Sequence, residues 1–266
     1  MPDTPRTRFA PTPSGYLHLG NVFNLLLAEA WRAETGGEIL LRIDDLDRSR
    51  FRPEYLQDVF RVADWLGIAF ELGPADPMEF AAHWSQSLRA PRYLRALQPL
   101  VESGEVFACT CSRREIAERS PDGTYPGTCR DKRIALDTFD AALRFRLDAR
   151  EVRGQPDSAF QDPVVRRKDG TVAYHVASVV DDVDYGITHI IRGMDLEPSS
   201  RLQRVVARAM GLRSFLEVEI HHHPLLAARD GSKLSKSAGS AARSLLEGDR
   251  SADEVRALFA SWLSST

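Results

Sequence analysis

Long apolar runs are absent from this chain. No stretch of its 266 residues approaches the roughly 18 consecutive apolar residues of a membrane span. Residues 1–7 are rich in Pro, Arg and Thr and do not form the apolar centre of a signal peptide. With 43% hydrophobic and 27% charged residues, the composition is that of an ordinary globular protein. We therefore expect a cytoplasmic protein with no membrane partner, and we expect it to be a monomer.

A surplus of positive charge is also absent, because the formal net charge is −3. Composition alone indicates nucleic-acid binding only when Lys and Arg are in excess on one face. Arginine-rich stretches occur at 113–114, 166–168 and 201–208. We interpret them as solvated surface, although they could also contact phosphates. Any RNA partner must therefore be inferred from motifs.

Cysteine is scarce, and Cys109, Cys111 and Cys129 are the only three. An odd number in so short a stretch argues against a secreted disulfide framework and for a metal site or a reactive site. Three thiolates suit zinc, which prefers about four tetrahedral ligands. The alternative is three reduced thiols in a loop.

The hydrophobic pattern predicts α/β structure at both ends of the chain. Arg6 to Ala10 is typical of a strand, Asn21 to Thr35 of a helix with Asn21 as its N-cap, and Glu38 to Asp44 of a buried strand. The loop after the first strand stands where open α/β sheets place their ligands. Further helices are expected at 53–66, 88–103, 173–182 and 199–210, and further strands at 143–147, 188–192 and 218–221.

The character of the sequence changes after Gly104 and returns to an α/β pattern near Tyr174. We therefore predict one Rossmann-like α/β domain, a parallel sheet with flanking helices, split by an insertion. Its first half covers 1–105, the insertion 106–172, the second half 173–240, and a C-terminal helical tail 241–266. No internal repeat or low-complexity segment is present in the sequence.

The first of two chemical motifs is PTPSGYLHLGN, at positions 11–21. Gly15 and Gly20 let the backbone approach a nucleotide, and helix amides near Asn21 favour an anionic phosphate. His18 can donate a hydrogen bond to that phosphate as negative charge builds in the transition state. Taken alone, the segment also fits an ordinary Pro/Gly loop.

The second motif is KLSKS, at positions 233–237. It offers two ammonium groups that could neutralise a departing pyrophosphate, and Lys236 is our first choice for that role. Taken alone, this segment also fits a solvated loop. The order of the two motifs and their strand–helix context together favour a shared nucleotide site.

Together the two motifs resemble the HIGH and KMSKS signatures of class I aminoacyl-tRNA synthetases. RFAPTPSGYLHLGN followed by LLRIDDLDR resembles the glutamyl branch, and the resemblance covers most of the chain. It implies a class I catalytic domain that activates L-glutamate with ATP, and Mg²⁺ is expected on the ATP phosphates. It also implies catalytic roles for His18 and Lys236. The implied ATP-binding residues are Pro11, Gly15, His18, Gly20, Asn21, Lys233, Ser235 and Lys236.

The resemblance also implies a glutamate pocket. Its residues would be Arg8, Phe9, Ala10, Pro11, Thr12, Asp44, Tyr174 and Arg192. These residue types suit glutamate, because planar Arg side chains bind carboxylates and a carboxylate binds an ammonium group.

Two positions depart from the family pattern. Asp44 stands where the family usually has Glu, so reaching the ammonium group would need a water or a small backbone shift. Asn21 stands where the signature ends in His, a position that varies in the glutamyl branch. The alternatives are a strand-end cap for Asp44 and a salt bridge to Asp195 for Arg192.

The pattern CxC followed by YxxxC resembles the zinc insertion of the glutamyl-queuosine tRNA(Asp) synthetases. It implies that Cys109, Cys111, Tyr125 and Cys129 hold a structural zinc, since four protein ligands leave no open position. The histidines at 221–223 cannot all bind one ion, because consecutive strand residues point to opposite faces.

The sequence continues only from 238 to 266 after the second motif, where a full glutamyl-tRNA synthetase carries a helical anticodon-binding region. This short form favours the glutamyl-queuosine branch, whose members attach glutamate to queuosine in the anticodon loop of tRNA(Asp). Three alternatives stay open. They are a truncated glutamyl-tRNA synthetase that charges tRNA(Glu), an HxGH-type adenylyltransferase and a non-catalytic zinc-bearing RNA-binding protein.

Overall fold

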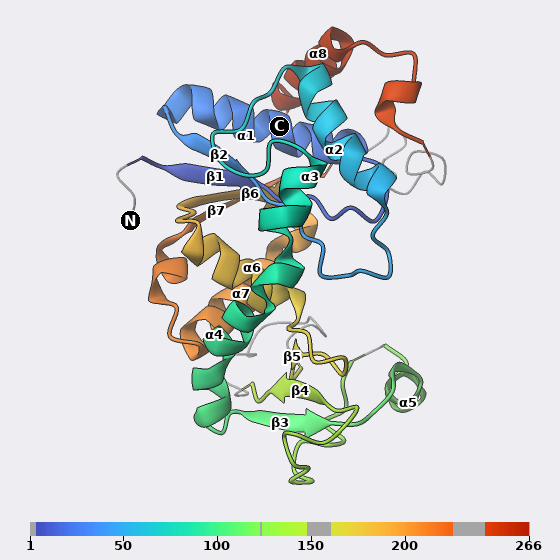
Figure 1. The fold of residues 1–266 in the computed structure, drawn as a ribbon, viewed down its shortest axis with the longest axis vertical. Helices are drawn as coiled ribbons and strands as arrows, with labels where there is room; N and C mark the ends of the chain where they lie inside the picture. Colours follow the sequence, from blue (N-terminus) through green and yellow to red (C-terminus); the bar gives the residue numbers. More distant parts are fainter. Residues whose placement is uncertain (1–3, 123, 148–160, 226–242, 266) are drawn as a thin grey trace. The chain divides into compact units, whose positions relative to one another are not determined.

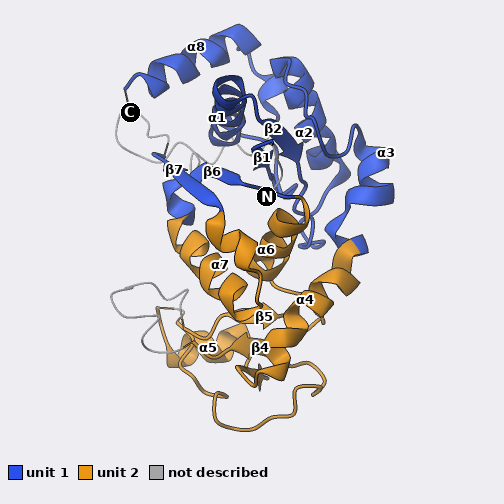
Figure 2. Ribbon diagram, turned by 90° about the vertical axis from the view of Figure 1, so that its left-hand side faces the viewer, with its two compact units in different colours: residues 1–88, 186–196, 218–266 blue, residues 89–185, 197–217 orange. Residues whose placement is uncertain are grey.

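The computed structural model describes residues 4–122, 124–147, 161–225 and 243–265 (Figure 1). The chain forms two compact units (Figure 2). Unit 1 comprises residues 1–88, 186–196 and 218–266, and unit 2 comprises residues 89–185 and 197–217. Among the described helices, none combines the length and apolar character that a bilayer crossing needs. The predicted domain boundaries at 105, 172 and 240 stay a prediction.

Two parallel two-stranded sheets lie side by side at the centre of unit 1. β1 (Arg6–Phe9) pairs in parallel with β2 (Glu38–Leu41), and β6 (His189–Gly193) pairs in parallel with β7 (Glu219–His223). The amide of Thr188 donates to the carbonyl of Arg6 at 2.9 Å, so β1 lies beside β6. The four predicted strands are confirmed, although β2 ends three residues earlier than predicted. Beyond it, Arg42 and Asp44 still donate backbone hydrogen bonds to Phe9 and Pro11.

Helix α1 (Leu19–Thr35) connects β1 to β2, and its N-cap is His18. The prediction of Asn21 as the N-cap was wrong. The backbone of His18 is extended, its Nδ1 accepts from the amides of Gly20 and Asn21 at 3.1 and 3.4 Å, and Asn21 Oδ1 accepts from the His18 amide at 3.1 Å. This reciprocal pair is a capping box. Asn21 is its third helical residue, and the helix begins two residues earlier than predicted.

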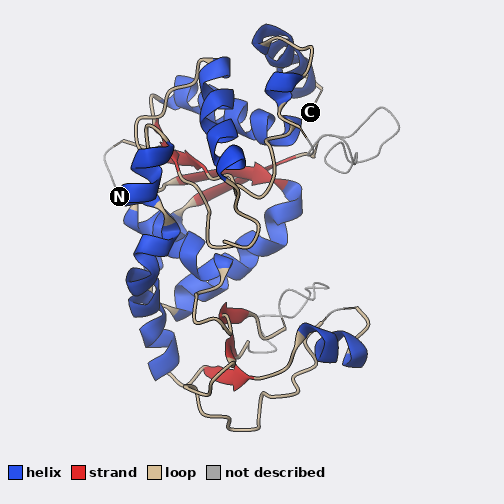
Figure 3. Cartoon of the chain, turned by 45° about the vertical axis from the view of Figure 1, so that its right-hand side comes forward, coloured by secondary structure: helices blue, strands red, loops and turns tan. Residues whose placement is uncertain are grey.

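Helices α1, α2 and α8 of unit 1 contribute side chains to one apolar core together with β1 and β2. Figure 3 shows the helices and strands of the chain. α2 (Pro53–Leu66) ends at Gly67, whose φ of 69° suits the left-handed C-cap, as predicted. α3 (Pro77–Glu79) continues into a wider turn at Phe80–Trp84. Short 3₁₀ turns occupy Gln86–Arg89 and Leu245–Glu247. In α8 (Ala252–Leu263), Phe259 and Trp262 pack on Phe23 of α1 at 5.5 Å each between ring centroids.

The described residues of unit 2 form an antiparallel sheet and four α-helices. Its strands are β3 (Val106–Cys109), β4 (Ala142–Phe145) and β5 (Val164–Arg166), and its helices are α4 (Ala90–Glu102), α5 (Arg113–Arg119), α6 (Tyr174–Asp184) and α7 (Glu197–Ala209). The predicted elements here are confirmed, with ends that differ by one or two residues. Buried Asp181 of α6 accepts from Tyr93 at 2.9 Å and from Arg89 at 2.8 Å, which ties α6 to α4.

Candidate active site

The loop at 11–21 leaves the carboxyl end of β1 and leads directly into α1. Ser14 N donates to Thr12 O at 2.8 Å to close a turn, and Asp44 N donates to Pro11 O at 2.9 Å. A side chain at Gly15 would meet no atom within 4 Å, whereas one at Gly20 would lie 2.9 Å from Cε1 of His18. The capping position of the His18 ring therefore leaves no room for a side chain at residue 20.

The capping contacts of His18 fix the tautomer of its ring. Because Nδ1 accepts from two backbone amides, the proton of the neutral imidazole is on Nε2. The ring thus has a hydrogen-bond donor at the N-terminus of α1, where the backbone amides and the helix dipole also favour an anion. The sequence placed His18 in this role, but only the structure shows why its donor atom is Nε2.

The three charged residues of the predicted glutamate pocket lie in unit 1. Arg8 is on β1, Arg192 is on β6, and Asp44 follows β2, and each side chain is almost fully buried. Asp44 pairs with Arg42, with Nε–Oδ1 and Nη2–Oδ2 distances of 2.7 and 3.0 Å. Gln86 Nε2 also donates to Asp44 Oδ1 at 3.2 Å. Asp44 therefore already balances the buried Arg42 guanidinium, two residues before it.

The other predicted binding residues have varied environments. Phe9 and Pro11 are buried, Ala10 is half-buried and Thr12 is exposed. Tyr174 is the first residue of α6 in unit 2 and is 38% exposed, and its place in the pocket stays a prediction. Lys233, Ser235 and Lys236 lie outside the described residues.

The histidines at 221–223 lie on β7. His223 Nε2 is 3.3 Å from Asn24 Nδ2 on α1, whereas His221 Nε2 is 3.7 Å from Glu219 and its ring stacks on His189 at 6.3 Å. His221 and His223, two positions apart, lie on the same face of β7, and their rings have different neighbours.

Sequence reasoning missed the polar partners that support the site. Arg42 and Gln86 hold Asp44, and Asp58 of α2 accepts the Leu17 amide of the loop at 2.9 Å. One signal was available, because Asp58 is an acid on the apolar face formed by Leu56, Val59 and Val62 of the predicted helix. Such a residue needs polar partners, although the pattern does not say which.

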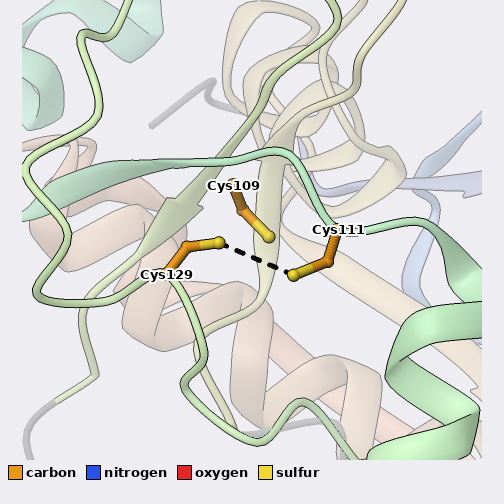
Figure 4. A group of neighbouring side chains, drawn as sticks. All are labelled: Cys109, Cys111 and Cys129. Carbon is orange, nitrogen blue, oxygen red and sulfur yellow. Dashed lines mark hydrogen bonds between the residues drawn. The ribbon is translucent and has the colours of Figure 1, made fainter.

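The three cysteines of unit 2 converge, with their sulfur atoms facing one another (Figure 4). All three Sγ atoms lie within 4.8 Å of one another, and Cys111 and Cys129 are 3.5 Å apart. Tetrahedral zinc with Zn–S bonds of about 2.3 Å needs sulfur atoms about 3.8 Å apart, so the cluster fits the metal. Burial, aided by the contact with Cys129, raises the pKa of the Cys111 thiol to about 11.

Tyr125 lies at this cluster and is buried. Its hydroxyl accepts from the Cys129 amide at 2.8 Å, its ring stacks on Phe107, and the Arg144 guanidinium lies 3.7 Å from the ring centroid. Burial raises the pKa of the phenol, with a further contribution from its hydrogen bond to Cys109. The phenol therefore stays protonated unless a cation lowers that pKa.

The fold and the loop at the N-terminus of α1 define the catalytic domain of a class I tRNA synthetase. The family model described as tRNA synthetases class I (E and Q), catalytic domain, matches residues 5–259. This match confirms the α/β fold class that the motifs implied.

Similar proteins narrow the assignment. A glutamyl-Q tRNA(Asp) synthetase of Parasynechococcus marenigrum is 39% identical over 98% of this chain and 83% of that protein. A glutamate–tRNA ligase 1 of Nitrosococcus oceani is 32% identical over 89% of this chain and 52% of that protein. The crystal structure of a glutamate–tRNA synthetase from Elizabethkingia anophelis matches with a TM-score of 0.72 and 27% identity over 88% of this chain. The chain spans about half of that synthetase, 53% of its length. The chain belongs to the glutamyl-Q tRNA(Asp) synthetase family of the class I synthetases.

The helix-capping role of His18, through Nδ1, can be tested separately from any catalytic role of its Nε2 donor. His18→Ala removes the side-chain acceptor for two helix amides and should lower the free energy of unfolding by about 1 kcal/mol. His18→Asn replaces it with one of the best N-cap residues and should stay within a few tenths of a kcal/mol of the wild type. Urea denaturation followed by circular dichroism measures both. Equal losses in the two variants would contradict the capping role.

Proposed function

We propose that this chain activates L-glutamate with ATP and transfers the glutamyl group to queuosine in the anticodon loop of tRNA(Asp). The main support is the similarity to a glutamyl-Q tRNA(Asp) synthetase along 98% of the chain. The chain is an ATP-dependent ligase of the class I synthetase type, with its phosphate-binding loop at the N-terminus of α1. We propose that it works as a monomer in the cytoplasm.

In the first step, a carboxylate oxygen of the glutamate α-carboxylate attacks the α-phosphorus of ATP in line. A P–O bond forms, the bond to pyrophosphate breaks, and glutamyl-adenylate results. His18 donates from Nε2 to the phosphate as charge builds, and Lys236 neutralises the departing pyrophosphate. One such donor contributes roughly 10²–10³-fold to a rate. Mg²⁺, when bound to the ATP phosphates, offsets their negative charge.

In the second step, a hydroxyl of queuosine attacks the activated carbonyl carbon. The new ester bond forms, AMP leaves, and the hydroxyl proton is released. The phosphate-binding loop at the N-terminus of α1 then stabilises the leaving AMP phosphate by the same contacts.

The glutamate pocket is built around buried charges of unit 1. Arg8 and Arg192 supply guanidinium groups in surroundings of low dielectric constant, where a carboxylate is bound more strongly than at the surface. Asp44 would receive the ligand ammonium group while remaining paired with Arg42, directly or through a water.

The second candidate function is charging of tRNA(Glu). It is favoured by the similarity to glutamate–tRNA ligases, although those matches cover about half of each relative. The family match removes the adenylyltransferase and the non-catalytic zinc protein from consideration. Both remaining functions share glutamate activation and differ only in the acceptor.

Zinc is the metal that we propose for unit 2. Cys109, Cys111 and Cys129 would bind it as thiolates, with Tyr125 as the fourth ligand. The ion would bind the sulfurs in their deprotonated form and join the end of β3 to the loop that carries Cys129. With four protein ligands its role would be structural.

Glutamate activation is testable without tRNA. The wild type should exchange labelled pyrophosphate into ATP when L-glutamate is present, and equal exchange with aspartate or glutamine would refute the pocket. Lys236→Ala should slow exchange by about 100-fold, because it removes one charge from the transition state. The exposed Lys132 supplies a control, and Lys132→Ala should exchange at the wild-type rate. His18→Asn should fold normally and also lose exchange.

The acceptor can be identified by labelled transfer. With glutamate and ATP, the enzyme should label tRNA(Asp) that carries queuosine and leave the same tRNA with guanosine at that position unlabelled. Unmodified tRNA(Glu) serves as the third substrate. Labelling of tRNA(Glu) alone would establish the second candidate function instead.

Metal analysis tests the zinc proposal. The purified wild type should contain about one zinc per chain, and Cys129→Ser should contain almost none. Tyr125→Phe should lose zinc to a chelator faster than the wild type, because one ligand is gone. Ser112→Ala is the control, since Ser112 caps the neighbouring helix α5 without belonging to the cluster. A folded wild type without metal would rule out the zinc site.

A further inference from the structure

A buried carboxylate in α2 holds two segments that lie far apart in the sequence. Asp58 is 2% exposed, its Oδ2 accepts from the amide of Leu17 at 2.9 Å, and its Oδ1 accepts from the hydroxyl of Ser244. Leu17 and Ser244 are also buried, at 3% exposure each. A buried carboxylate is unfavourable without such donors, so these hydrogen bonds determine where both segments lie.

The first segment is the phosphate-binding loop, at the residue before His18. The backbone of Leu17 is held by Asp58, and the ring of the preceding Tyr16 packs edge-on against Tyr55, with the centroids 5.0 Å apart. Tyr55 and Asp58 are three residues apart on α2 and share one face of that helix. Helix α2 therefore holds two successive loop residues immediately before the imidazole.

The second segment follows the KLSKS motif in the sequence, with Ser244 seven positions after Ser237 (244 − 237). The Ser244 hydroxyl group donates to Asp58 while its oxygen accepts from the Leu246 amide at 3.2 Å. This contact starts the short 3₁₀ turn at Leu245–Glu247, and Leu245 and Leu246 pack against the core of unit 1. One carboxylate thus anchors the loop that precedes His18 and the chain that follows the lysine motif.

We propose that Asp58 is a positioning residue for the adenylation step, and that it acts by setting the orientation of His18. This inference rests on the proposed function. The Leu17 amide fixes the backbone that enters the N-cap, so losing that hydrogen bond lets the His18 ring shift relative to the phosphate. A misplacement of about 1 Å is enough to lower a rate by about 100-fold. Asp58 itself need not touch a substrate.

The proposal is tested by pyrophosphate exchange with single variants. Asp58→Ala removes both contacts and should lower kcat by about 100-fold, with the KM for glutamate within about twofold of the wild type. Asp58→Asn keeps an oxygen that can accept from Leu17 and should recover about 10-fold of that loss. Ser244→Ala leaves the Leu17 contact in place and should cost less than Asp58→Ala.

A double-variant cycle distinguishes positioning from general destabilisation. If Asp58 acts through the imidazole, Asp58→Ala should cost less than about threefold in a His18→Asn background. If the rate loss of the double variant equals the product of the two single-variant losses, the proposal is overturned. If Asp58→Ala does not fold, the double variant Asp58→Asn/Ser244→Ala replaces it in the cycle. Its effect on exchange is then compared in the wild-type and His18→Asn backgrounds.

Ser251 supplies the matched control. It caps α8 through the Glu254 amide, as Ser244 caps its own turn, but it does not contact Asp58. Ser251→Ala should exchange at the wild-type rate, and a loss equal to that of Ser244→Ala would overturn the role of the Asp58 contact. If the wild type exchanges pyrophosphate and the Asp58 variants exchange it at the same rate, this inference alone is refuted. If the wild type shows no exchange, the proposed function is refuted together with this inference.

Discussion

Hydrogen bonds on both edges of β1 join three distant parts of the chain. One edge pairs Arg6–Phe9 with Glu38–Leu41, and the other accepts the amide of Thr188, 182 positions from Arg6. Arg6 and Thr188 each stand at the start of their strands. The carboxyl ends of these strands therefore lie together, where the segment at 11–21 follows β1, Asp44 lies beyond β2 and Arg192 lies near the end of β6. The position of the candidate site in unit 1 is a consequence of this pairing.

Placing charged side chains at these strand ends has an energetic cost, because an ion removed from water loses several kcal/mol of solvation. The structure offsets it with specific partners. Asp44 pairs with Arg42 two residues earlier, on the same face of the extended chain. Asp45 accepts from the Ser85 hydroxyl at 2.6 Å and the Gln86 amide at 2.8 Å. Removing one member would leave its partner buried and uncompensated, so these residues are constrained as a group.

Local sequence signals predicted the bounds of elements whose first and last residues favour a helix start or stop. α2 was predicted to the residue, because Pro53 favours a first turn and Gly67 favours a C-cap. The start of α1 was missed, since a histidine acting as an N-cap depends on a ring orientation that spacing does not encode. β3 and α5 were not predicted, because a four-residue strand buried throughout has no alternation and a seven-residue helix has few turns.

In the candidate site, too, some residues were predictable from the sequence and others were not. Short sequence motifs pointed to His18 and to the three cysteines. The cysteines do lie together, whereas the catalytic role of His18 stays a prediction. The partners that orient them were not found, because Asp58 meets Ser244 across 186 positions. An acid on the apolar face of a helix indicates that polar partners exist, but only the fold selects them. Short motifs therefore identify candidate chemical groups, while their orientation is determined by tertiary hydrogen bonds that leave no regular pattern in the sequence.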